Sequence, residues 1–488
     1  MATLPRWLQR IEHAGNRLPH PTLLFVWLCL LLLPVSALVA WWQPDAAHPV
    51  SGDPLMVQSL LSASGLRWML TSMVTNFTGF APLGVVLVAM LGIGLAEQGG
   101  LLGQLLSAMV RRARDSWLVP LVALAGVLSS MAADAGYVVL IPLAALLFQQ
   151  AGRSPRIGIA VAFAAVSGGF SANLLLGPID ALLAGISTEA ARTLDPHAHV
   201  SAAANYWFML VSTLLVVTVI TLVTRRLEGP HDTRAITTPA PALAAPRRWG
   251  STLLVLVLYL LALALLTLPA GAPLRHPETD TLLPSPFLSG IVIVIALGFA
   301  ACGLAFGYSN GYFRRSSDVI AALEKTMSQL AGYLVLMFFA AQFVAWFNWS
   351  GMALVMAVKG AAWLTTWALP PALLMVALVM LVALLNLLVG SASAKWALLA
   401  PMLIPMLMLA GVAPEATQAA FRVGDSATNI ITPLMPYYAL VLGFLRQHDR
   451  DAGIGTLMAL MLPYSLTLLV SWSLLLAVWL AAGWPLGF

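Results

Sequence analysis

Apolar runs of about 20 residues recur along most of the chain, and short polar or basic segments separate them. An α-helix needs a run of about this length to cross the hydrocarbon core of a bilayer. The first run is too long for the apolar region of a cleavable signal, and it ends in Trp41 and Trp42, which is typical of a membrane interface. The pattern predicts nine membrane crossings, at 21–42, 81–108, 157–187, 205–224, 251–270, 286–306, 328–347, 415–444 and 457–484.

Two further apolar segments, at 117–150 and 371–412, are too long for one ordinary span and short for two. Small and polar residues interrupt each segment at its middle, at 129–134 and at 390–395. Irregular backbone is tolerated at membrane depth only where it is buried in protein or lines a watery cavity. We therefore expect an all-α polytopic membrane protein with nine transmembrane helices plus two re-entrant hairpins, although two tightly spaced spans at 117–150 would fit the same pattern.

The composition supports a membrane protein and gives it an orientation. Of the 488 residues, 60% are hydrophobic and 9% are charged, whereas a soluble globular chain carries about 25% charged residues. An ordinary water-soluble enzyme is thereby excluded. With the N-terminus in the cytoplasm, 18 of the 24 Lys and Arg residues fall in cytoplasmic segments and 4 on the other side. Because short cytoplasmic loops are rich in Lys and Arg, we expect this orientation.

The two interrupted segments and the residues after them resemble one another. The sequence 151–155 matches 410–414 at Ala, Gly and Pro, and 171–178 lies on 426–433. The first loop is basic whereas the second has no Lys or Arg, so the loops should face opposite sides, as in the inverted repeats of secondary transporters. The predicted layout is a cytoplasmic segment 1–20, a first transmembrane half 21–224 with hairpin 117–150 and broken helix 157–187, a cytoplasmic linker 225–250, and a second half 251–488 with hairpin 371–412 and broken helix 415–444.

Five ionisable side chains remain in segments predicted at membrane depth, and all five lie in the repeats. A charge at the bilayer centre costs about 2.5–3.5 kcal/mol, so it usually faces a cavity or a partner. Salt bridges that only hold helices together are the alternative interpretation for any one of them. The residues are Asp134, Asp180, Lys395, Arg422 and Asp425.

Arg422 and Asp425 are three residues apart, so on a helix they share a face and could pair directly. A guanidinium can bind a carboxylate through two parallel hydrogen bonds. We therefore expect Arg422 to bind an anionic substrate group, while Asp425 either holds Arg422 or carries a proton. Asp180, two residues after Pro178, is the candidate coupling carboxylate of the first repeat. No role follows for Asp134, for Lys395 or for Glu97, which lies before a Gly-Gly pair.

The tip of the second hairpin carries oxygen donors and an aromatic ring. Ser391, Ser393 and Asn386 could supply oxygen ligands to sodium, because unwound helix ends serve this purpose in transporters. Close packing of small residues would produce a similar tip. Trp396 could hold an aromatic substrate ring or could be an interfacial anchor.

At these residues the sequence resembles the p-aminobenzoyl-glutamate transporter (AbgT) family, over nearly the whole chain. The stretches 76–84, 333–343 and 424–433 carry the resemblance. It implies nine transmembrane helices plus two re-entrant hairpins, a homodimer, and a place in the bacterial inner membrane. The family's site positions fall on Asp180, Asn386, Ser393, Trp396, Pro414, Arg422, Asp425 and Pro433.

The resemblance implies a secondary active transporter of p-aminobenzoyl-glutamate or related p-aminobenzoate-like compounds, driven by a sodium or proton gradient. Efflux of sulfonamide antimetabolites is the alternative, and the sequence leaves direction and coupling ion open. A small anionic aromatic substrate and the lipid bilayer are the expected partners, with no nucleic acid and no cofactor other than sodium. An intramembrane aspartyl protease is a remote alternative, because its G-x-G-D element is absent: Arg422-Val423 precedes Gly424-Asp425. We do not expect an enzyme.

Overall fold

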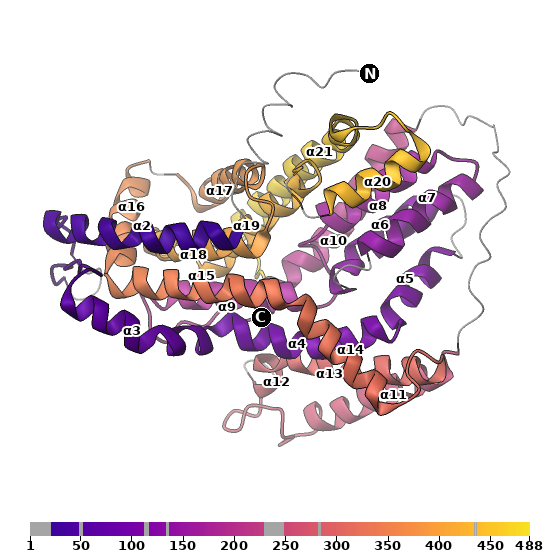
Figure 1. Cartoon of the computed structure of the whole chain (residues 1–488), viewed down its shortest axis with the longest axis horizontal. Helices are drawn as coiled ribbons and strands as arrows, with labels where there is room; N and C mark the ends of the chain where they lie inside the picture. The colour runs from indigo at the N-terminus through magenta and orange to yellow at the C-terminus, as the bar shows by residue number, and fades with distance from the viewer. Residues whose placement is uncertain are drawn as a thin grey trace.

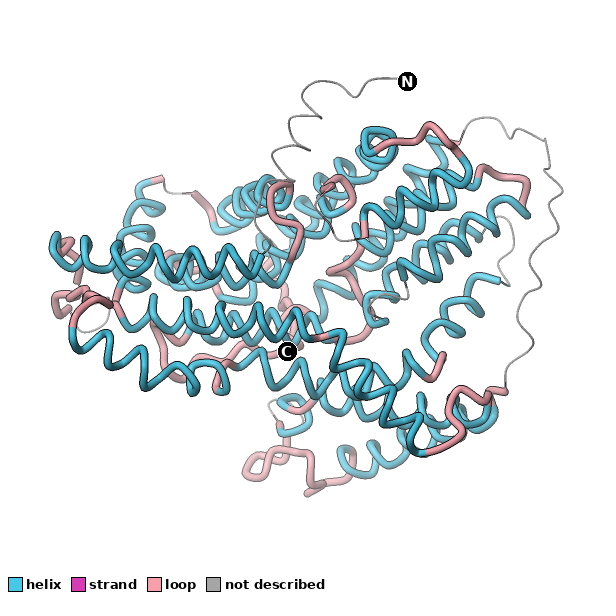
Figure 2. Tube along the Cα trace, viewed as in Figure 1, coloured by secondary structure: helices cyan, strands magenta, loops and turns pink. Residues whose placement is uncertain are grey.

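The computed structural model describes residues 21–47, 52–111, 117–132, 136–228, 248–281, 285–367, 369–433, 435 and 437–488. Within these residues the chain is helical and forms no strand beyond one isolated bridge between Ala47 and Pro54. Helices of different length cross one another in several layers (Figure 1), and irregular segments connect them (Figure 2).

The helices of the first half end at the polar stretch that divides the chain, of which residues 229–247 lie outside the described part. Their bounds are α2 Pro21–Trp42, α3 Ala63–Thr78, α4 Ala81–Gln98, α5 Leu101–Arg111, α6 Leu118–Leu128, η2 Ser129–Ala132, η3 Gly136–Leu140, α7 Ile141–Gln150, α8 Pro155–Phe163, η4 Ala164–Gly168, α9 Pro178–Ala191 and α10 Tyr206–Leu227.

The helices of the second half follow that stretch. Their bounds are α11 Gly250–Thr267, α12 Pro286–Ser289, α13 Ile291–Ser309, α14 Ser316–Gln329, α15 Ala331–Trp349, α16 Met352–Thr366, α17 Pro371–Asn386, α18 Ala392–Leu409, α19 Pro414–Asn429, α20 Tyr438–His448 and α21 Ile454–Ala481.

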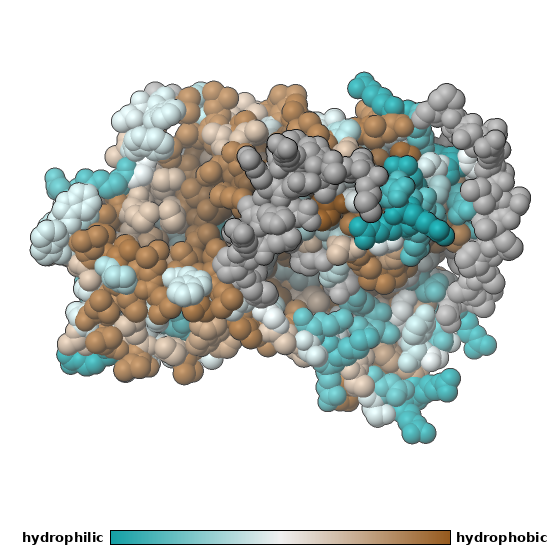
Figure 3. All heavy atoms as spheres, turned by 45° about the horizontal axis from the view of Figure 1, so that its top comes forward, coloured by the Kyte–Doolittle hydropathy of each residue, from teal (hydrophilic) through white to brown (hydrophobic). Residues whose placement is uncertain are grey.

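Eight helices of the described part are long and apolar enough to cross a bilayer, or up to nine if the bent pair α16–α17 counts as one span. The prediction of an all-helical polytopic membrane protein is thereby confirmed. The visible surface agrees, because apolar residues cover much of one side while hydrophilic residues gather toward the margins (Figure 3).

Burial along α2 shows how a membrane helix divides its surface. Phe25, Cys29, Leu32 and Ser36 recur every three or four residues and are buried, which puts them on one helix face. This face packs against α15, where the Phe25 ring meets Phe343 edge-on at 5.9 Å. The opposite face exposes apolar side chains, as expected of a helix that contacts lipid.

The prediction of one continuous span at 81–108 was wrong. Helix α4 ends at Gln98, and α5 begins at Leu101 in a new direction because Gly100 has φ +79°, a conformation that glycine adopts at low cost. Glu97 lies in the last turn of α4. The sequence pattern also missed three helices: α3, α14 and α16.

The two interrupted segments form similar clamps. In the first, α6 and α7 both pack against α8; in the second, α17 and α18 both pack against α19. The middle of the first segment, with Asp134, lies outside the described residues. After η4 the chain is not helical at residues 169–177, and α19 ends at Asn429 before α20 begins at Tyr438.

The matched turns of the two repeats have the same hydrogen bonds. Gly152 and Gly411 both have positive φ, +69° and +82°. The N–H of Arg153 donates to the carbonyl of Phe148 at 2.8 Å, and the N–H of Val412 donates to that of Leu407 at 2.9 Å. Pro155 and Pro414 then begin α8 and α19, where a missing N–H costs nothing. Identical turns at aligned positions support the internal repeat.

Candidate functional site

Helix α19 forms the centre of the candidate site, because α9, α17, α18 and α21 all pack against it. Every residue from Ala416 to Asn429 is buried, although this stretch includes Arg422 and Asp425. Gly424 makes the packing possible, since a Cβ there would lie 2.5 Å from the carbonyl oxygen of Val379 on α17. The charges of Arg422 and Asp425 are therefore held among helices and must find partners there.

Arg422 pairs with Asp180 across the two halves of the chain. The Nη2 atom lies 2.5 Å from Asp180 Oδ1, and the two side chains are 2% and 0% exposed. The other carboxylate oxygen accepts the N–H of Gly177 at 2.6 Å. Asp180 sits in the first turn of α9, where the helix dipole also favours a negative charge. Helix α9 thus holds the carboxylate that receives the guanidinium.

Two nitrogen atoms of Arg422, Nε and Nη1, have no hydrogen-bond partner among the described residues, and both are buried. A buried donor without a partner costs about 1–3 kcal/mol, and more for a charged group. The guanidinium therefore has donors available for a second acceptor besides Asp180.

Asp425 pairs with Lys395 of α18. The Nζ and Oδ1 atoms are 2.5 Å apart, and the side chains are 2% and 1% exposed. Lys395 also donates to Asn386 Oδ1. The amide nitrogen of Asn386 donates to the carbonyl of Asp425 at 2.7 Å and to Thr428 Oγ1 at 2.9 Å. Asn386 thereby ties the end of α17 to both members of the pair.

Of the two roles considered for Asp425, direct pairing with Arg422 is not the arrangement in the structure. The two residues share a face of α19, but each finds a carboxylate or ammonium partner on another helix. Spacing along one helix allows the direct pair, which is worth only a few tenths of a kcal/mol. Two buried cross-helix pairs neutralise all four charges instead.

Trp396 follows Lys395 on α18 and is fully buried. Its Nε1–H group lies within hydrogen-bonding distance of Ser187 Oγ at 3.1 Å and of the Leu183 carbonyl at 3.2 Å. The ring packs against Phe421, with 4.5 Å between centroids. Because the side chain is buried inside the helix bundle, the interpretation of Trp396 as an interfacial anchor does not hold.

A chain of uncharged polar groups continues from Trp396 and was not predicted from the sequence. Ser187 donates to Gln418 Oε1 at 2.6 Å, and Gln418 Nε2 donates to Asn205 Oδ1 at 2.9 Å. Asn205 Nδ2 donates to the carbonyl of Glu415 at 2.9 Å. Ser187, Gln418 and Asn205 are at most 1% exposed. The position of Gln418, one helical turn before Arg422, is the signal that could have identified it.

The remaining predicted residues lie around this centre. Ser391 and Ser393 are half-buried, with hydroxyl oxygens 3.2 Å apart, and Ser391 also accepts the N–H of Ala394 at the start of α18. Pro414 begins α19, so it is about 12 Å from Arg422 along the helix axis. Pro433 lies in the break between α19 and α20. The structure therefore gathers Asp180, Asn386, Trp396, Arg422 and Asp425, but not Pro414.

The positions that correspond to Arg422 and Asp180 in the repeat alignment form a neutral contact. Under the alignment of Ser171 with Ser426, Arg422 corresponds to Ser167 and Asp180 corresponds to Met435. The structure brings Ser167 Oγ within 3.2 Å of Met435 Sδ. The aligned serines meet as well, because the N–H of Ser171 donates to Ser426 Oγ at 3.1 Å. Of the two contacts that the repeat relates, Arg422–Asp180 is charged and Ser167–Met435 is neutral.

Comparisons with known proteins give a consistent result. The model of the AbgT putative transporter family matches residues 6–488. The p-aminobenzoyl-glutamate transport protein of Escherichia coli (strain K12) is 38% identical over 491 residues, which are 99% of this chain and 95% of that protein.

Two solved structures are also similar. The Alcanivorax borkumensis YdaH transporter has 59% identity and a TM-score of 0.93, over 96% of this chain and 100% of that one. Neisseria gonorrhoeae MtrF, described with a class of antimetabolite efflux pumps, has 42% identity and a TM-score of 0.91, over 97% of each chain.

Proposed function

Because the chain belongs to the AbgT putative transporter family, we propose that it is a secondary active transporter of p-aminobenzoyl-glutamate or related p-aminobenzoate-like compounds. A sodium or proton gradient drives the movement. The name of the Escherichia coli relative supports the substrate, a small aromatic anion.

The observation that carries this proposal is the buried guanidinium with unused donors. Arg422 is held by Asp180, yet Nε and Nη1 have no acceptor among the described residues. A substrate carboxylate that contacts Arg422 would satisfy these donors through charge-assisted hydrogen bonds. It would also weaken the attraction between Arg422 and Asp180, which links substrate binding to the contact between the two halves.

Aromatic side chains next to this guanidinium suit the ring of the substrate. Phe421 directly precedes Arg422, and its ring packs against Trp396. An aminobenzoyl ring between or beside these rings would gain the offset or edge contacts that aromatic pairs prefer. Neighbouring residues of α18 and α19 would then bind the carboxylate and the ring of the substrate.

The coupling ion acts, in this proposal, at the Lys395–Asp425 pair. A proton on Asp425 would remove the negative partner of Lys395. A sodium ion bound by Asn386, Ser391 and Ser393 would instead compete with the Lys395 ammonium, which already uses Asn386 Oδ1. Either event separates groups that now join α17, α18 and α19.

The proposed topology is nine transmembrane helices plus two re-entrant hairpins in an inverted repeat, with the N-terminus in the cytoplasm. The protein forms a homodimer in the bacterial inner membrane. Each clamp moves with its broken helix against the remaining spans and exposes the site to one side at a time. The identical turns at Gly152 and Gly411 support the repeat on which this movement depends.

Efflux of sulfonamide antimetabolites is the second candidate. The similarity to MtrF favours it, and sulfonyl oxygens can accept hydrogen bonds from Arg422 as a carboxylate does. An aspartyl protease fits less well. Asp180 and Asp425 are each paired with a different cation, whereas a pair of catalytic aspartates shares one site and one proton.

The test is transport in proteoliposomes with sodium and proton gradients imposed separately, in both directions, for labelled p-aminobenzoyl-glutamate and for a labelled sulfonamide. We expect gradient-driven movement of at least one compound. Asp425→Ala should abolish the response to the gradient, and Arg422→Lys should lower the affinity for the anion. Arg192→Lys is the matched control, because Arg192 is half-exposed and pairs with Glu189 away from the site.

Movement that persists unchanged in both variants would overturn the assigned site. If neither compound moves under any gradient, the proposed substrates are wrong for this chain.

A further inference from the structure

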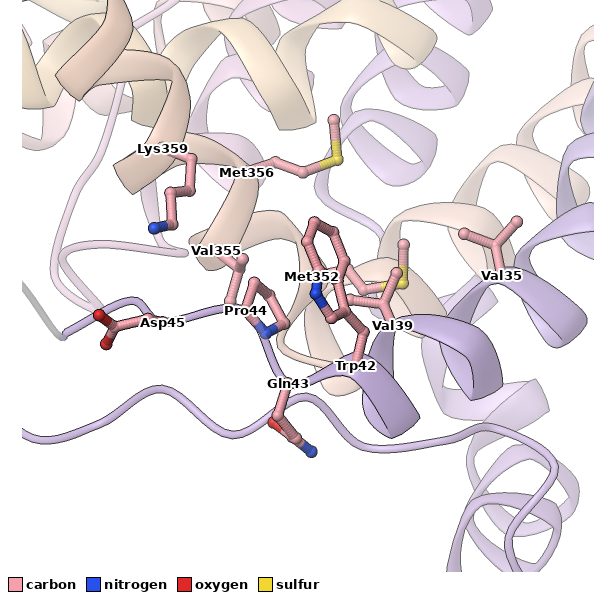
Figure 4. A pocket seen from close by; sticks show the side chains of 10 residues that line it. All are labelled: Val35, Val39, Trp42, Gln43, Pro44, Asp45, Met352, Val355, Met356 and Lys359. Atoms are coloured by element: carbon pink, nitrogen blue, oxygen red, sulfur yellow. The ribbon is translucent and has the colours of Figure 1, made fainter.

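A cavity of about 780 Å³ lies between the C-terminal end of α2, the segment that follows it, and α16. None of its lining residues belongs to the site described above. Figure 4 shows the side chains that surround it, with Val35 and Val39 on α2 and Met352, Val355 and Met356 on α16.

The parts of the cavity wall that α2 and α16 form are largely apolar. The five aliphatic side chains named above carry no polar group that forms hydrogen bonds. Val35 precedes Trp42 by two helical turns, so the apolar wall runs about 10 Å along the axis of α2. A groove of this length accommodates the part of a lipid acyl chain that is next to the head group.

One side of the cavity carries two opposite charges. Lys359 of α16 and Asp45 of the segment after α2 are both exposed, and Figure 4 shows them on the same side. In the described part of the chain neither side chain has an ion-pair or hydrogen-bond partner. A cation and an anion that face a common opening without pairing complement a ligand that carries both signs.

The segment that carries Asp45 is fixed in place. The Gln43 side chain donates to the carbonyl of Val57 at 2.9 Å and accepts the N–H of Val57 at 3.2 Å. The N–H of Gln58 donates to the carbonyl of Ser350, at the turn that starts α16. The cavity is therefore a built feature, and both of its walls belong to one hydrogen-bonded unit.

Exposed tryptophans close in sequence to both charged residues indicate that the charged side of the cavity lies at the depth of lipid head groups. Trp41 and Trp42 end α2 and are exposed, and so are Trp363 of α16 and Trp367, which follows that helix. Tryptophan is enriched at the boundary between hydrocarbon and water. Helix α16 is bent by 117° from α17 and runs across the direction of α2 and α15 (Figure 1), as expected of a helix that lies along the membrane surface.

We propose that this cavity binds a zwitterionic phospholipid with a primary ammonium head group, such as phosphatidylethanolamine. Lys359 binds the phosphate, Asp45 binds the ammonium, and one acyl chain lies against Val35, Val39 and Val355. An anionic lipid or a free phosphate satisfies Lys359 but is repelled by Asp45. A choline head group has no N–H to donate to Asp45.

The test is native mass spectrometry of the full-length protein after exchange into an equimolar mixture of phosphatidylethanolamine, phosphatidylglycerol and phosphatidylcholine. We expect the wild type to retain phosphatidylethanolamine in preference to the other two. Asp45→Asn should lower this preference by up to about fivefold, the effect of losing one exposed ion pair. Lys359→Gln should lower retention of all phosphate-bearing lipids.

Met356→Trp fills the cavity from an exposed position and should abolish specific retention while leaving the fold intact. Arg67→Gln is the matched control, because Arg67 is an exposed cation on α3, outside the cavity, and should change nothing. The same spectra report the number of chains in the assembly.

Three results would overturn the proposal: equal retention of the three lipids by the wild type, unchanged preference in both Asp45→Asn and Met356→Trp, or a change in oligomeric state instead of lipid retention in Met356→Trp. The last result would assign the cavity to a contact with a second copy of the chain.

Discussion

Each of the four described charges at the centre of the molecule has its partner on a different helix, and the environments of the partners are unequal. Asp180 keeps the Gly177 N–H and the N-terminus of α9 even without Arg422. Arg422 has no described hydrogen-bond partner except Asp180. A buried charge that loses its partner destabilises a protein strongly, by about 3–5 kcal/mol.

Replacing Asp180 or Arg422 by an apolar residue of similar size should therefore lower the free energy of unfolding by different amounts. We expect Asp180→Leu to lower the free energy of unfolding by about 3–5 kcal/mol, and Arg422→Met to lower it by less. Denaturant unfolding of the purified protein measures both. If Arg422→Met costs as much as Asp180→Leu, the local stabilisation of Asp180 does not operate.

The hydrogen bond from Trp396 to Ser187 should orient the indole ring for the substrate. Removing it in Ser187→Ala should raise KM for an aromatic substrate by about two- to tenfold, since a buried hydrogen bond contributes about 0.5–1.5 kcal/mol. The maximal rate should change little, and Ser187→Thr should restore the affinity.

Thr188→Val is the control for this prediction, because Thr188 is the next residue of α9 and its hydroxyl bonds to the backbone of Ala184 and Val200 and not to Trp396. A similar rise in KM in this variant would mean that α9 is disturbed as a whole and that Ser187 has no specific role.

At this scale the sequence predicts which charges matter, but it does not predict their partners. Asp180, Lys395, Arg422 and Asp425 stand out because charge is expensive at membrane depth. Their pairing depends on how α9, α18 and α19 pack, which spacing along α19 cannot reveal. Uncharged polar residues are common in membrane helices, so the Ser187–Gln418–Asn205 chain becomes visible only once three helices are placed together.

At the scale of the helices, the close contact of α17 with α19 depends on Gly424, which has no side chain. In Gly424→Ala the new Cβ would lie 2.5 Å from Val379 O and 2.9 Å from Val382 Cβ. Overpacking of this kind costs about 1–3 kcal/mol. We expect a lower melting temperature and slower transport for the purified variant.

Gly443→Ala provides the comparison, since nothing lies within 4 Å of a Cβ at that position of α20. This variant should be neutral or slightly stabilising. Helix propensity favours Ala over Gly at both positions, so equal losses in the two variants would show that the close α17–α19 contact does not cause the loss at Gly424.

The two clamps should have to move for transport. Tyr137 of the first clamp stacks on Tyr437 of the second broken helix, with 4.1 Å between ring centroids. Cysteines at these two positions, joined by a short bismaleimide in a background without Cys29 and Cys302, should stop transport. A cross-link between cysteines at 363 and 367, at the C-terminal end of α16, should not. Transport by the first cross-linked variant would refute movement at this contact.

The positions of Pro, Gly and Ser predicted the broken helices and the interrupted segments, because these residues favour changes in backbone geometry. Helices α3, α14 and α16 were missed for a different reason. They carry Arg67, Glu324 and Lys359 respectively, and each is shorter than a full span. A search for apolar runs of 20 residues cannot detect helices that end or lie at the membrane surface.

For the molecule as a whole, the asymmetry of basic residues predicts which side faces the cytoplasm. In the same cysteine-free background, Lys359→Cys should react in intact cells with a maleimide that does not cross the membrane. Lys325→Cys should react only after permeabilisation. Both side chains are exposed in the protein. The opposite labelling pattern would reverse the proposed orientation.

The ion pair between Asp180 and Arg422 has a consequence for biosynthesis. Asp180 is made with the first half, whereas its cation follows 242 residues later. Until then the ribosome has delivered a carboxylate to membrane depth without its counter-charge, at a cost of about 2.5–3.5 kcal/mol if it stays ionised. The second half alone has the converse fault, because Lys395 and Arg422 exceed Asp425 by one positive charge. Each half inserted alone thus holds an unpaired charge at membrane depth, which gives membrane quality control a feature to recognise. Association of the two halves pairs both charges at once.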